Sequence, residues 1–201
     1  MASFRINTKN LYSKISKNKK FQQQVNKKVS LAVDANAKAA LQEFESHPVT
    51  EEIRSGPNAR NSSGTLGGYG NLFSFIGFEN GTDPISPLSK LIKTAIMVKK
   101  IKNTTAGKQI KLRFEIGIPT DQQIRIVTPM PWEGGSWAEG IESGISGFSY
   151  YMYKKFGSGR SGMGLQTDHE LGKAIFNPQA YVSEIIKNFS KNVRREIKKV
   201  K

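Results

Sequence analysis

The longest regular pattern of apolar and polar positions in the chain runs from Lys19 to Ser46. Lysines occupy one face of this segment, and Pro48 follows it, which ends the pattern because proline disfavours helical backbone in the residue before it. The other face carries apolar side chains at steps of three and four residues, the spacing of an amphipathic helix: Phe21, Val25, Val29, Ala32, Val33, Ala37, Ala40, Leu41 and Phe44. The pattern predicts a long helix that dominates an N-terminal helical region, 1–46.

A second helical pattern closes the chain. Asn177-Pro178 supplies an N-cap residue followed by proline at the first helical position. Basic residues gather towards the end of the segment, where the helix dipole favours cations. Apolar residues recur at strict four-residue steps: Tyr181, Ile185, Phe189, Val193 and Ile197. This pattern predicts a basic C-terminal helix over 177–201 that begins at Asn177.

Strict alternation marks the segment Gln109–Ile118, whose isoleucine, leucine and phenylalanine residues alternate with charged residues and glycine. A period of two predicts a strand with one buried and one solvated face. Pro119-Thr120-Asp121 predicts a turn, and Ile124–Thr128 predicts the strand that returns from it to complete a hairpin. A short helix after Pro87 and a strand over Ala95–Ile101 precede this hairpin, so the predicted sheet region covers 92–128.

Two segments lack a regular period. Residues 54–71 contain five glycines and a proline and predict a flexible loop, with the compact apolar segment Leu72–Phe78 after it. Residues 129–176 are rich in glycine and aromatic residues, with one predicted helical turn at Trp137–Glu142. The chain is therefore expected to be a single α+β domain, 1–201, in which a small antiparallel sheet packs against a long N-terminal helix and a C-terminal helix, with long glycine-rich loops.

Composition narrows the class of protein. The hydrophobic fraction of 37% is lean for 201 residues, which suggests that partner chains contribute to stability. Cysteine is absent, so disulfides and thiolate metal sites are excluded. No apolar run approaches the roughly 18–20 residues that span a bilayer, and the first ten residues contain no signal-peptide core. We expect a soluble protein that is made in the cytoplasm and does not enter a membrane.

Charge is the most informative part of the composition, because the net charge of +15 is segregated. Residues 1–46 carry nine Lys/Arg against three acids, residues 90–114 carry eight against none, and residues 187–201 carry seven against one. Such blocks are typical of a surface that faces a polyanion, usually nucleic acid. The alternative interpretation is that the basic blocks are helix faces that keep the protein soluble. The side chains expected near DNA are Lys99, Lys100, Lys102, Arg194, Arg195, Lys198 and Lys199.

Catalytic chemistry has little support. His47 precedes a proline, a position typical of a surface or capping residue. Asp168-His169-Glu170 lacks distant partners for a metal ion, and the carboxylate pairs Glu51/Glu52 and Glu139/Glu142 have spacings that are common on solvated faces. The glycines of 64–70 match neither phosphate-binding pattern. We therefore expect no enzyme, no cofactor and no bound metal; a hydrolase that uses Glu51/Glu52 or Asp168/His169 is the weakest alternative.

The aromatic residues after Pro129 allow two interpretations. Interleaved with Lys154, Lys155 and Arg160, they have the composition of a surface that stacks single-stranded bases. Tryptophan and tyrosine are equally typical of the core and of subunit contacts, and the chain has no RNA-recognition motif. We favour core and interface roles, with Trp132, Trp137, Tyr150, Tyr151 and Tyr153 as the expected interface residues.

The order of these elements resembles the tail-completion or head–tail connector (neck) proteins of tailed bacteriophages. In that family the long helix ends near a Pro-Val-x-Thr-Gly loop, and an aromatic-Ala-x-x-(Ile/Val)-Glu-x-Gly segment precedes the terminal helix. Pro48-Val49-Thr50 matches the first element, with Glu51 in place of the glycine. Trp137-Ala138, Ile141-Glu142 and Gly144 match the second, and the stretch from Gly147 to Asn177 is longer than the family pattern.

The resemblance implies a virion structural subunit without catalysis. Its copies would form a ring between the portal of the capsid and the tail tube, in contact with adjacent connector, portal or tail-tube proteins, with genomic DNA passing through. The virion is then the expected location. The alternative function is a free protein that binds nucleic acid without sequence preference.

Overall fold

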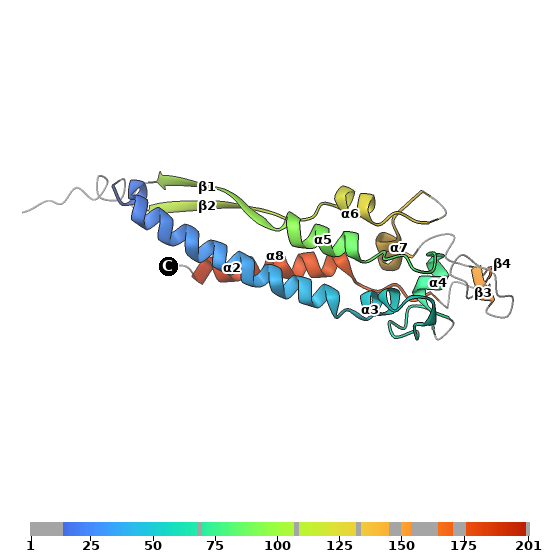
Figure 1. The fold of residues 1–201 in the computed structure, drawn as a ribbon. Coiled ribbons are helices and arrows are strands. Elements are labelled where there is room, and N and C mark those ends of the chain that lie inside the picture. Colours follow the sequence, from blue (N-terminus) through green and yellow to red (C-terminus); the bar gives the residue numbers. More distant parts are fainter. Residues whose placement is uncertain are drawn as a thin grey trace, which may run out of the picture.

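The computed structural model describes residues 14–67, 70–106, 109–131, 134–144, 150–153, 165–170 and 176–199. The molecule is elongated (Figure 1): two antiparallel helices, α2 (Lys19–Glu45) and α8 (Val182–Lys199), run along its length, and a two-stranded sheet lies over one end of them. Short helices and loops fill the other end. The expected α+β architecture is confirmed. The expected extended start at Phe4–Ile6 and the first helical turn from Thr8 lie outside the described residues, apart from a helical turn at 14–17.

Helix α2 has nearly the bounds that its apolar stripe predicts. Its N-cap is Asn18, whose side-chain oxygen accepts hydrogen bonds from the backbone N–H groups of Lys20 and Phe21. The stripe is buried at Val29, Val33, Ala40 and Phe44. Pro48 does more than end this helix, because it is also the first residue of a new one, α3 (Pro48–Arg54), in which proline at the first position leaves no hydrogen bond unmade.

Helix α8 confirms the four-residue apolar period but begins later than expected. Tyr181, Ile185, Phe189 and Val193 are buried. The predicted start at Asn177-Pro178 is wrong, because backbone groups of this stretch bond to distant segments: Asn177 N donates to Thr65 O at 2.8 Å, and Gln179 N donates to Ile141 O at 3.0 Å. These bonds hold residues 177–181 out of helical geometry.

The main sheet is a hairpin of β1 (Met97–Ala106) and β2 (Gln109–Gly117). The strand predicted over 109–118 is confirmed to Gly117, and the strand predicted over Ala95–Ile101 begins later, at Met97, and continues to Ala106. A shift in register between Val98 and Lys100 leaves Lys99 at a bulge. At the base of the hairpin Gly117 is required by a close approach, since a Cβ there would lie 2.7 Å from the carbonyl oxygen of Ala95.

The predicted returning strand over 124–128 is wrong. Residues 124–127 belong to helix α6 (Asp121–Val127), Thr128 is its C-cap, and β2 pairs with the preceding strand β1. The reason is a capping box at the predicted turn: Gln123 N donates to Thr120 Oγ1, while Thr120 N donates to Gln123 Oε1 at 3.1 Å. This reciprocal pair favours a helix over a strand. The sheet proper is therefore confined to 97–117 of the expected region 92–128.

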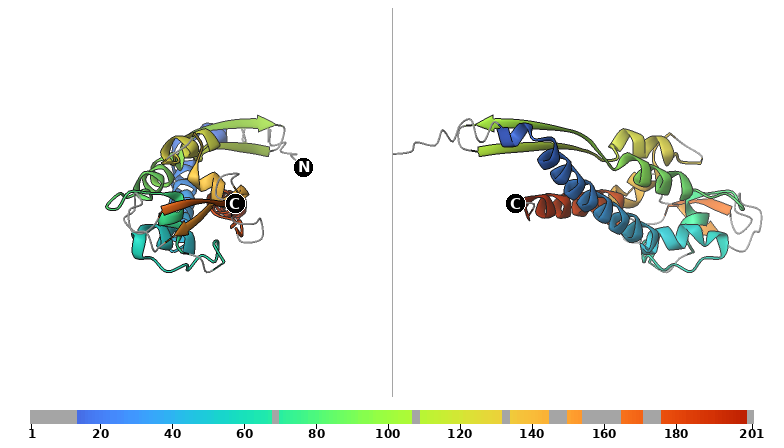
Figure 2. Two further views of the ribbon diagram at one scale, coloured as in Figure 1. Left: turned by 90° about the vertical axis from the view of Figure 1, so that its right-hand side faces the viewer. Right: turned by 60° about the vertical axis from the view of Figure 1, so that its left-hand side comes forward.

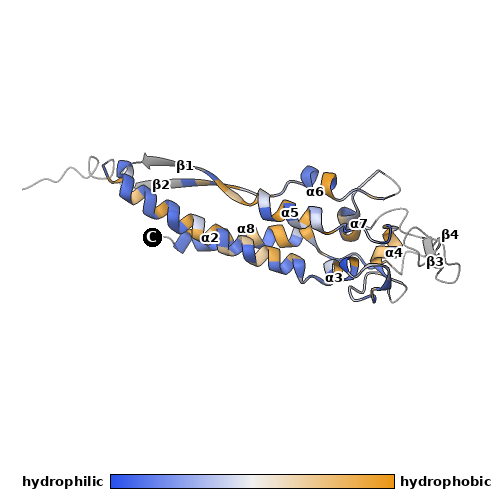
Figure 3. Ribbon diagram, in the orientation of Figure 1, coloured by the Kyte–Doolittle hydropathy of each residue, from blue (hydrophilic) through white to orange (hydrophobic). Residues whose placement is uncertain are grey.

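Short elements build the opposite end of the molecule. They are the 3-10 turn η1 (Gly56–Asn58), α4 (Leu72–Ile76), α5 (Ser86–Ala95) and α7 (Trp137–Ser143), together with a second antiparallel pair, β3 (Tyr150–Tyr153) and β4 (Leu165–Glu170). Helix α5 begins just before Pro87, as expected, and α7 confirms the predicted helical turn. All residues of α4 are buried, and all but Ser74 are apolar, while the N-terminal half of α2 is largely hydrophilic (Figure 3). No described helix combines the length and apolar character needed to cross a bilayer.

The centre of the core is a group of large rings between α2, α7 and the start of α8. Tyr181 is buried, with ring centroids 5.7 Å from Phe44, 4.8 Å from His47 and 6.4 Å from Trp137. The Tyr181 hydroxyl lies 2.6 Å from Thr50 Oγ1, so the one polar atom of this ring has a buried partner. The group connects the two helices of the long axis to the short elements.

Candidate functional site

The tertiary structure brings most cations of the three basic blocks to one end of the molecule, although Lys90 and Lys93 of the second block lie on α5 (Ser86–Ala95) outside it. The N-terminal part of α2, the hairpin and the C-terminal half of α8 all lie there (left side of Figure 1, and left side of the right-hand view in Figure 2). Residues 14–38, 97–106, 109–117 and 187–199 contain eighteen Lys/Arg and three Asp/Glu. The rest of the described chain contains five and twelve. The molecule is therefore strongly polarised; we call the first set of residues the basic end.

The cations expected near DNA lie on two elements of this end. Lys99 is exposed at the bulge of β1, and Lys100 and Lys102 follow on the same strand. Arg194, Arg195, Lys198 and Lys199 are exposed on the last turns of α8. Lys199 forms an ion pair with Glu196 at 2.9 Å, whereas the other three form none within the described residues. The exposed side chains of Lys99, Arg194, Arg195 and Lys198 are thus available to a ligand.

A groove of about 560 Å³ lies between β2 and α8 on the basic end. Its floor is apolar and includes Phe114, Ile116, Phe189, Val193 and Ile197. Three cations, Arg113, Arg194 and Lys198, also line it, together with Ile118 and Ser190, and no acid belongs to the lining. The groove therefore combines apolar surface with positive charge, which suits an acidic protein segment better than bare phosphate.

The carboxylates that the sequence raised as catalytic candidates do not form pairs. Glu51 is exposed, but Glu52 is 1% exposed and accepts two backbone hydrogen bonds, from Leu72 N at 2.7 Å and Ser63 N at 2.8 Å. Glu52 thereby ties the middle of the glycine-rich loop, at Ser63, and the residue that follows the loop, Leu72, to α3. Sequence reasoning missed this role, because a carboxylate beside Glu51 in a polar stretch carries no sign of burial. The expected flexible loop 54–71 also buries Thr65 and Leu66.

The remaining titratable candidates are also held by structural contacts. Glu139 pairs with Arg125 at 2.6 Å, and Glu142 accepts from Ser183 N at 2.7 Å near the start of α8. His47 caps α3, with its Nδ1 accepting from Val49 N at 3.3 Å; burial lowers the pKa of His47 below its usual value. No cluster of three metal-ligating side chains occurs in the described parts of the chain. The side chains of Asp168, His169 and Glu170 on β4 lie outside those parts.

The aromatic residues predicted at an interface divide into three cases. Trp137 is 1% exposed, so this expected interface residue is chiefly a core residue: its indole contacts Phe78 edge-on, with ring centroids 6.0 Å apart. Tyr150, Tyr151 and Tyr153 lie on β3, for which the structure describes the backbone. Trp132 lies outside the described residues.

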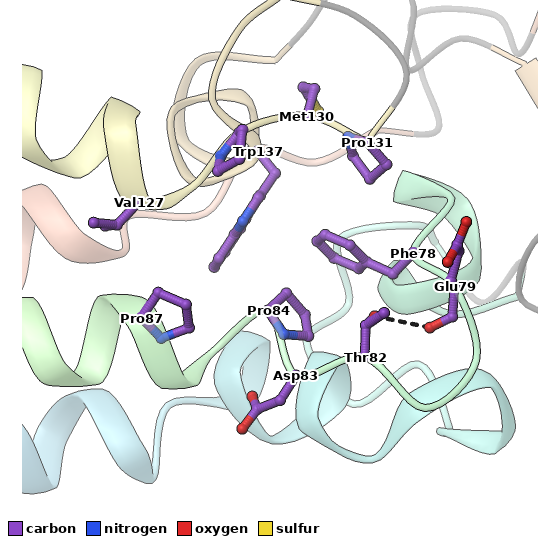
Figure 4. Close-up of a pocket in the computed structure, with 11 residues that line it drawn as sticks. Phe78, Glu79, Thr82, Asp83, Pro84, Pro87, Val127, Met130, Pro131 and Trp137 are labelled. Carbon is purple, nitrogen blue, oxygen red and sulfur yellow. Dashed lines mark hydrogen bonds between the residues drawn. The ribbon is translucent and has the colours of Figure 1, made fainter.

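A second concave site, of about 360 Å³, lies between the loop 78–87 and the segment that joins α6 to α7 (Figure 4). Trp137, Phe78, Met130 and four prolines line it, and Glu79 and Asp83 stand at its rim. No cation is among the lining residues that the structure describes. We call it the proline pocket. The signal for it in the sequence was the clustering of Pro84, Pro87, Pro129 and Pro131 near aromatic residues.

Comparison of the chain with protein-family models, with curated proteins and with solved structures finds no match. The functional interpretation consequently depends on the polarity of the molecule, its groove and its pocket.

Proposed function

We propose that the protein is a structural subunit of a tailed-phage virion, a neck or tail-completion protein whose copies form a ring between the portal and the tail tube. Its basic end faces the DNA path or the acidic surface of an adjacent protein. The protein does no bond-breaking and uses no cofactor.

One observation carries this proposal: cations from three basic blocks that are far apart in the sequence meet at one end of an elongated subunit. Non-specific attraction to phosphate needs lysine and arginine without base-reading geometry, and the cations of α8 and β1 meet that requirement. A solubilising role would not require three separate elements to converge. The net charge is therefore best explained by a polyanion that the assembled surface faces.

Two further features support a protein that works in an assembly. The groove between β2 and α8 offers an apolar floor with a cationic rim to an adjacent portal, connector or tail-tube protein. The candidate carboxylates Glu52, Glu139 and Glu142 each hold a structural contact. Their positions are explained by folding without recourse to acid–base catalysis.

Assembly tests the proposal directly. Light scattering and negative-stain images of the purified protein, alone and mixed with the portal or tail-tube proteins encoded beside it, should show rings. Monomers under every one of these conditions would contradict the proposal.

A free nucleic-acid-binding protein is the second candidate, favoured by the same basic end. A gel-shift series with an arbitrary duplex at increasing salt separates the two functions. A free binder should hold the duplex at sub-micromolar concentrations as a monomer, whereas a neck subunit should bind weakly until it is assembled.

A further inference from the structure

We propose that the proline pocket is the socket for the next copy of this chain, and that the side chain of Leu31 on α2 is the knob that enters it. The inference deepens the proposed ring function and rests on it. It assigns the two complementary surfaces that join one subunit to its neighbour.

The socket has the chemistry of a protein contact. Its walls, formed by Phe78, Trp137 and several prolines, are rigid and apolar, and the prolines donate no backbone hydrogen bonds to water. Glu79 and Asp83 at the rim are exposed and carry negative charge. Figure 4 shows Phe78, Trp137 and Pro84 around the same open space. An apolar side chain flanked by cations complements such a site.

Leu31 is such a side chain. It is 59% exposed, on the face of α2 opposite the buried Val29 and Val33, so it does not serve the core. Lys27 and Lys28, one turn before it, are exposed on the same face, and Lys38 follows two turns later. Asp34 is the acid on this face. A convex apolar knob with cations around it therefore stands on the basic end, and an apolar socket with a negative rim stands on the other part of the molecule.

The uneven distribution of charge along the molecule determines which contact between two copies is favourable. Two basic ends repel each other, so a symmetric dimer through them is unfavourable, whereas a basic end against the acidic rim of a neighbour is attractive. Such a head-to-tail contact uses two different surfaces and repeats from copy to copy, which produces a ring when the rotation closes. Surfaces that face DNA, on β1 and α8, remain free in this arrangement because the knob lies on α2.

A disulfide test exploits the absence of cysteine from the chain. In the double variant Leu31→Cys/Thr82→Cys, each copy carries one thiol at the knob and one at the socket. Mild oxidation of the full-length protein should give a ladder of covalent multimers on non-reducing gels, because every copy bonds to two neighbours. Each single variant should stop at dimers. Disulfides need Cα atoms within about 7 Å, so the ladder reports direct contact.

The matched control is Met97→Cys/Thr82→Cys, because Met97 is 50% exposed and also lies on the basic end. The control should give no ladder above dimers. Leu31→Asp should weaken self-association at least about tenfold, as expected for an anchor side chain, while Leu31→Met should preserve it. Glu79→Lys should weaken it as well, and Lys27→Glu in the same chain should restore part of the loss.

The outcomes separate this inference from the proposed function. A ladder from the Leu31 pair alone supports the contact. Rings that form without a ladder, or equal ladders from both pairs, overturn the socket assignment and leave the ring function intact. A chain that never assembles, even with neighbouring virion proteins, overturns both.

Discussion

Charged residues have different structural roles at the two ends of the molecule. Away from the basic end, carboxylates are used to build the fold: Glu52 holds the glycine-rich loop, Glu142 receives a backbone N–H near the start of α8, and Glu139 pairs with Arg125. On the basic end, Arg194, Arg195 and Lys198 extend into solvent without ion pairs in the described residues. Folding accounts for the first set, so function has to account for the second.

The largest expected effect is at the buried ring group. Trp137→Ala removes a side chain that is 1% exposed and opens a cavity beside Tyr181 and Phe78, which should lower the free energy of unfolding by about 4 kcal/mol. Arg194→Ala on the basic end should change it by less than about 0.5 kcal/mol. Urea unfolding followed by circular dichroism compares the two. Equal losses of unfolding free energy in the two variants would contradict this difference between the two ends.

The next largest effect is at Glu52. Glu52→Ala leaves two backbone donors, Leu72 N and Ser63 N, without their acceptor and should cost about 3 kcal/mol in the same unfolding measurement. Glu51→Ala, one residue away and exposed, is the control and should be nearly neutral. A neutral Glu52 variant would mean that the loop does not depend on this carboxylate.

Replacing cations on α8 should affect the binding of DNA rather than the stability of the fold. Arg194→Gln/Arg195→Gln/Lys198→Gln should leave stability unchanged, while the affinity for duplex DNA at low salt should fall about a hundredfold. The slope of log affinity against log salt should decrease by about 3 if all three reach phosphates. The control Arg54→Gln/Arg60→Gln removes cations away from the basic end. Binding that falls equally in the control would show that only net charge matters.

A smaller effect is expected where Thr50 meets Tyr181. Thr50→Val leaves the buried hydroxyl of Tyr181 without its partner at 2.6 Å and should cost about 1–3 kcal/mol. Burial raises the pKa of this hydroxyl well above its ordinary value, so ionisation does not relieve the loss. The double variant Thr50→Val/Tyr181→Phe should recover part of the stability. A double-mutant cycle that shows no coupling would contradict the contact.

The smallest expected effect is the pH dependence of His47. Because burial lowers the pKa of His47 in the folded protein, the unfolded chain takes up its proton at a higher pH. The contribution of neutral His47 to the free energy of unfolding is therefore complete above the unfolded pKa of about 6.5, and it is lost as the pH falls through the pKa of the folded protein. Urea unfolding at pH 8 and pH 5.5 should show a smaller difference in His47→Asn, which keeps a capping oxygen. If the difference in the free energy of unfolding between the two pH values is the same in the variant, the pH dependence comes from other groups.

Local patterns predicted some elements better than others. The stripes of α2 and α8 and the alternation of β2 were readable because one face of each contacts the core over many residues. The partner of β2 was not readable, since alternation reports a strand and says nothing about its neighbour. The segment 124–128 is too short for its period to be decisive, and the capping box from Thr120 to Gln123 settled its structure.

The candidate site also has some properties that local sequence patterns predict and others that they do not. The amino-acid sequence by itself determined the amphipathic helices, the positive charge and its three blocks, because these depend on residue identity and local spacing. Only the tertiary structure decided that cations of the three blocks share one end, that Trp137 is internal, that Glu52 is buried and that a pocket forms between prolines from two distant loops. Those properties depend on antiparallel packing of α2 against α8 and on backbone hydrogen bonds between remote segments, which no local pattern encodes.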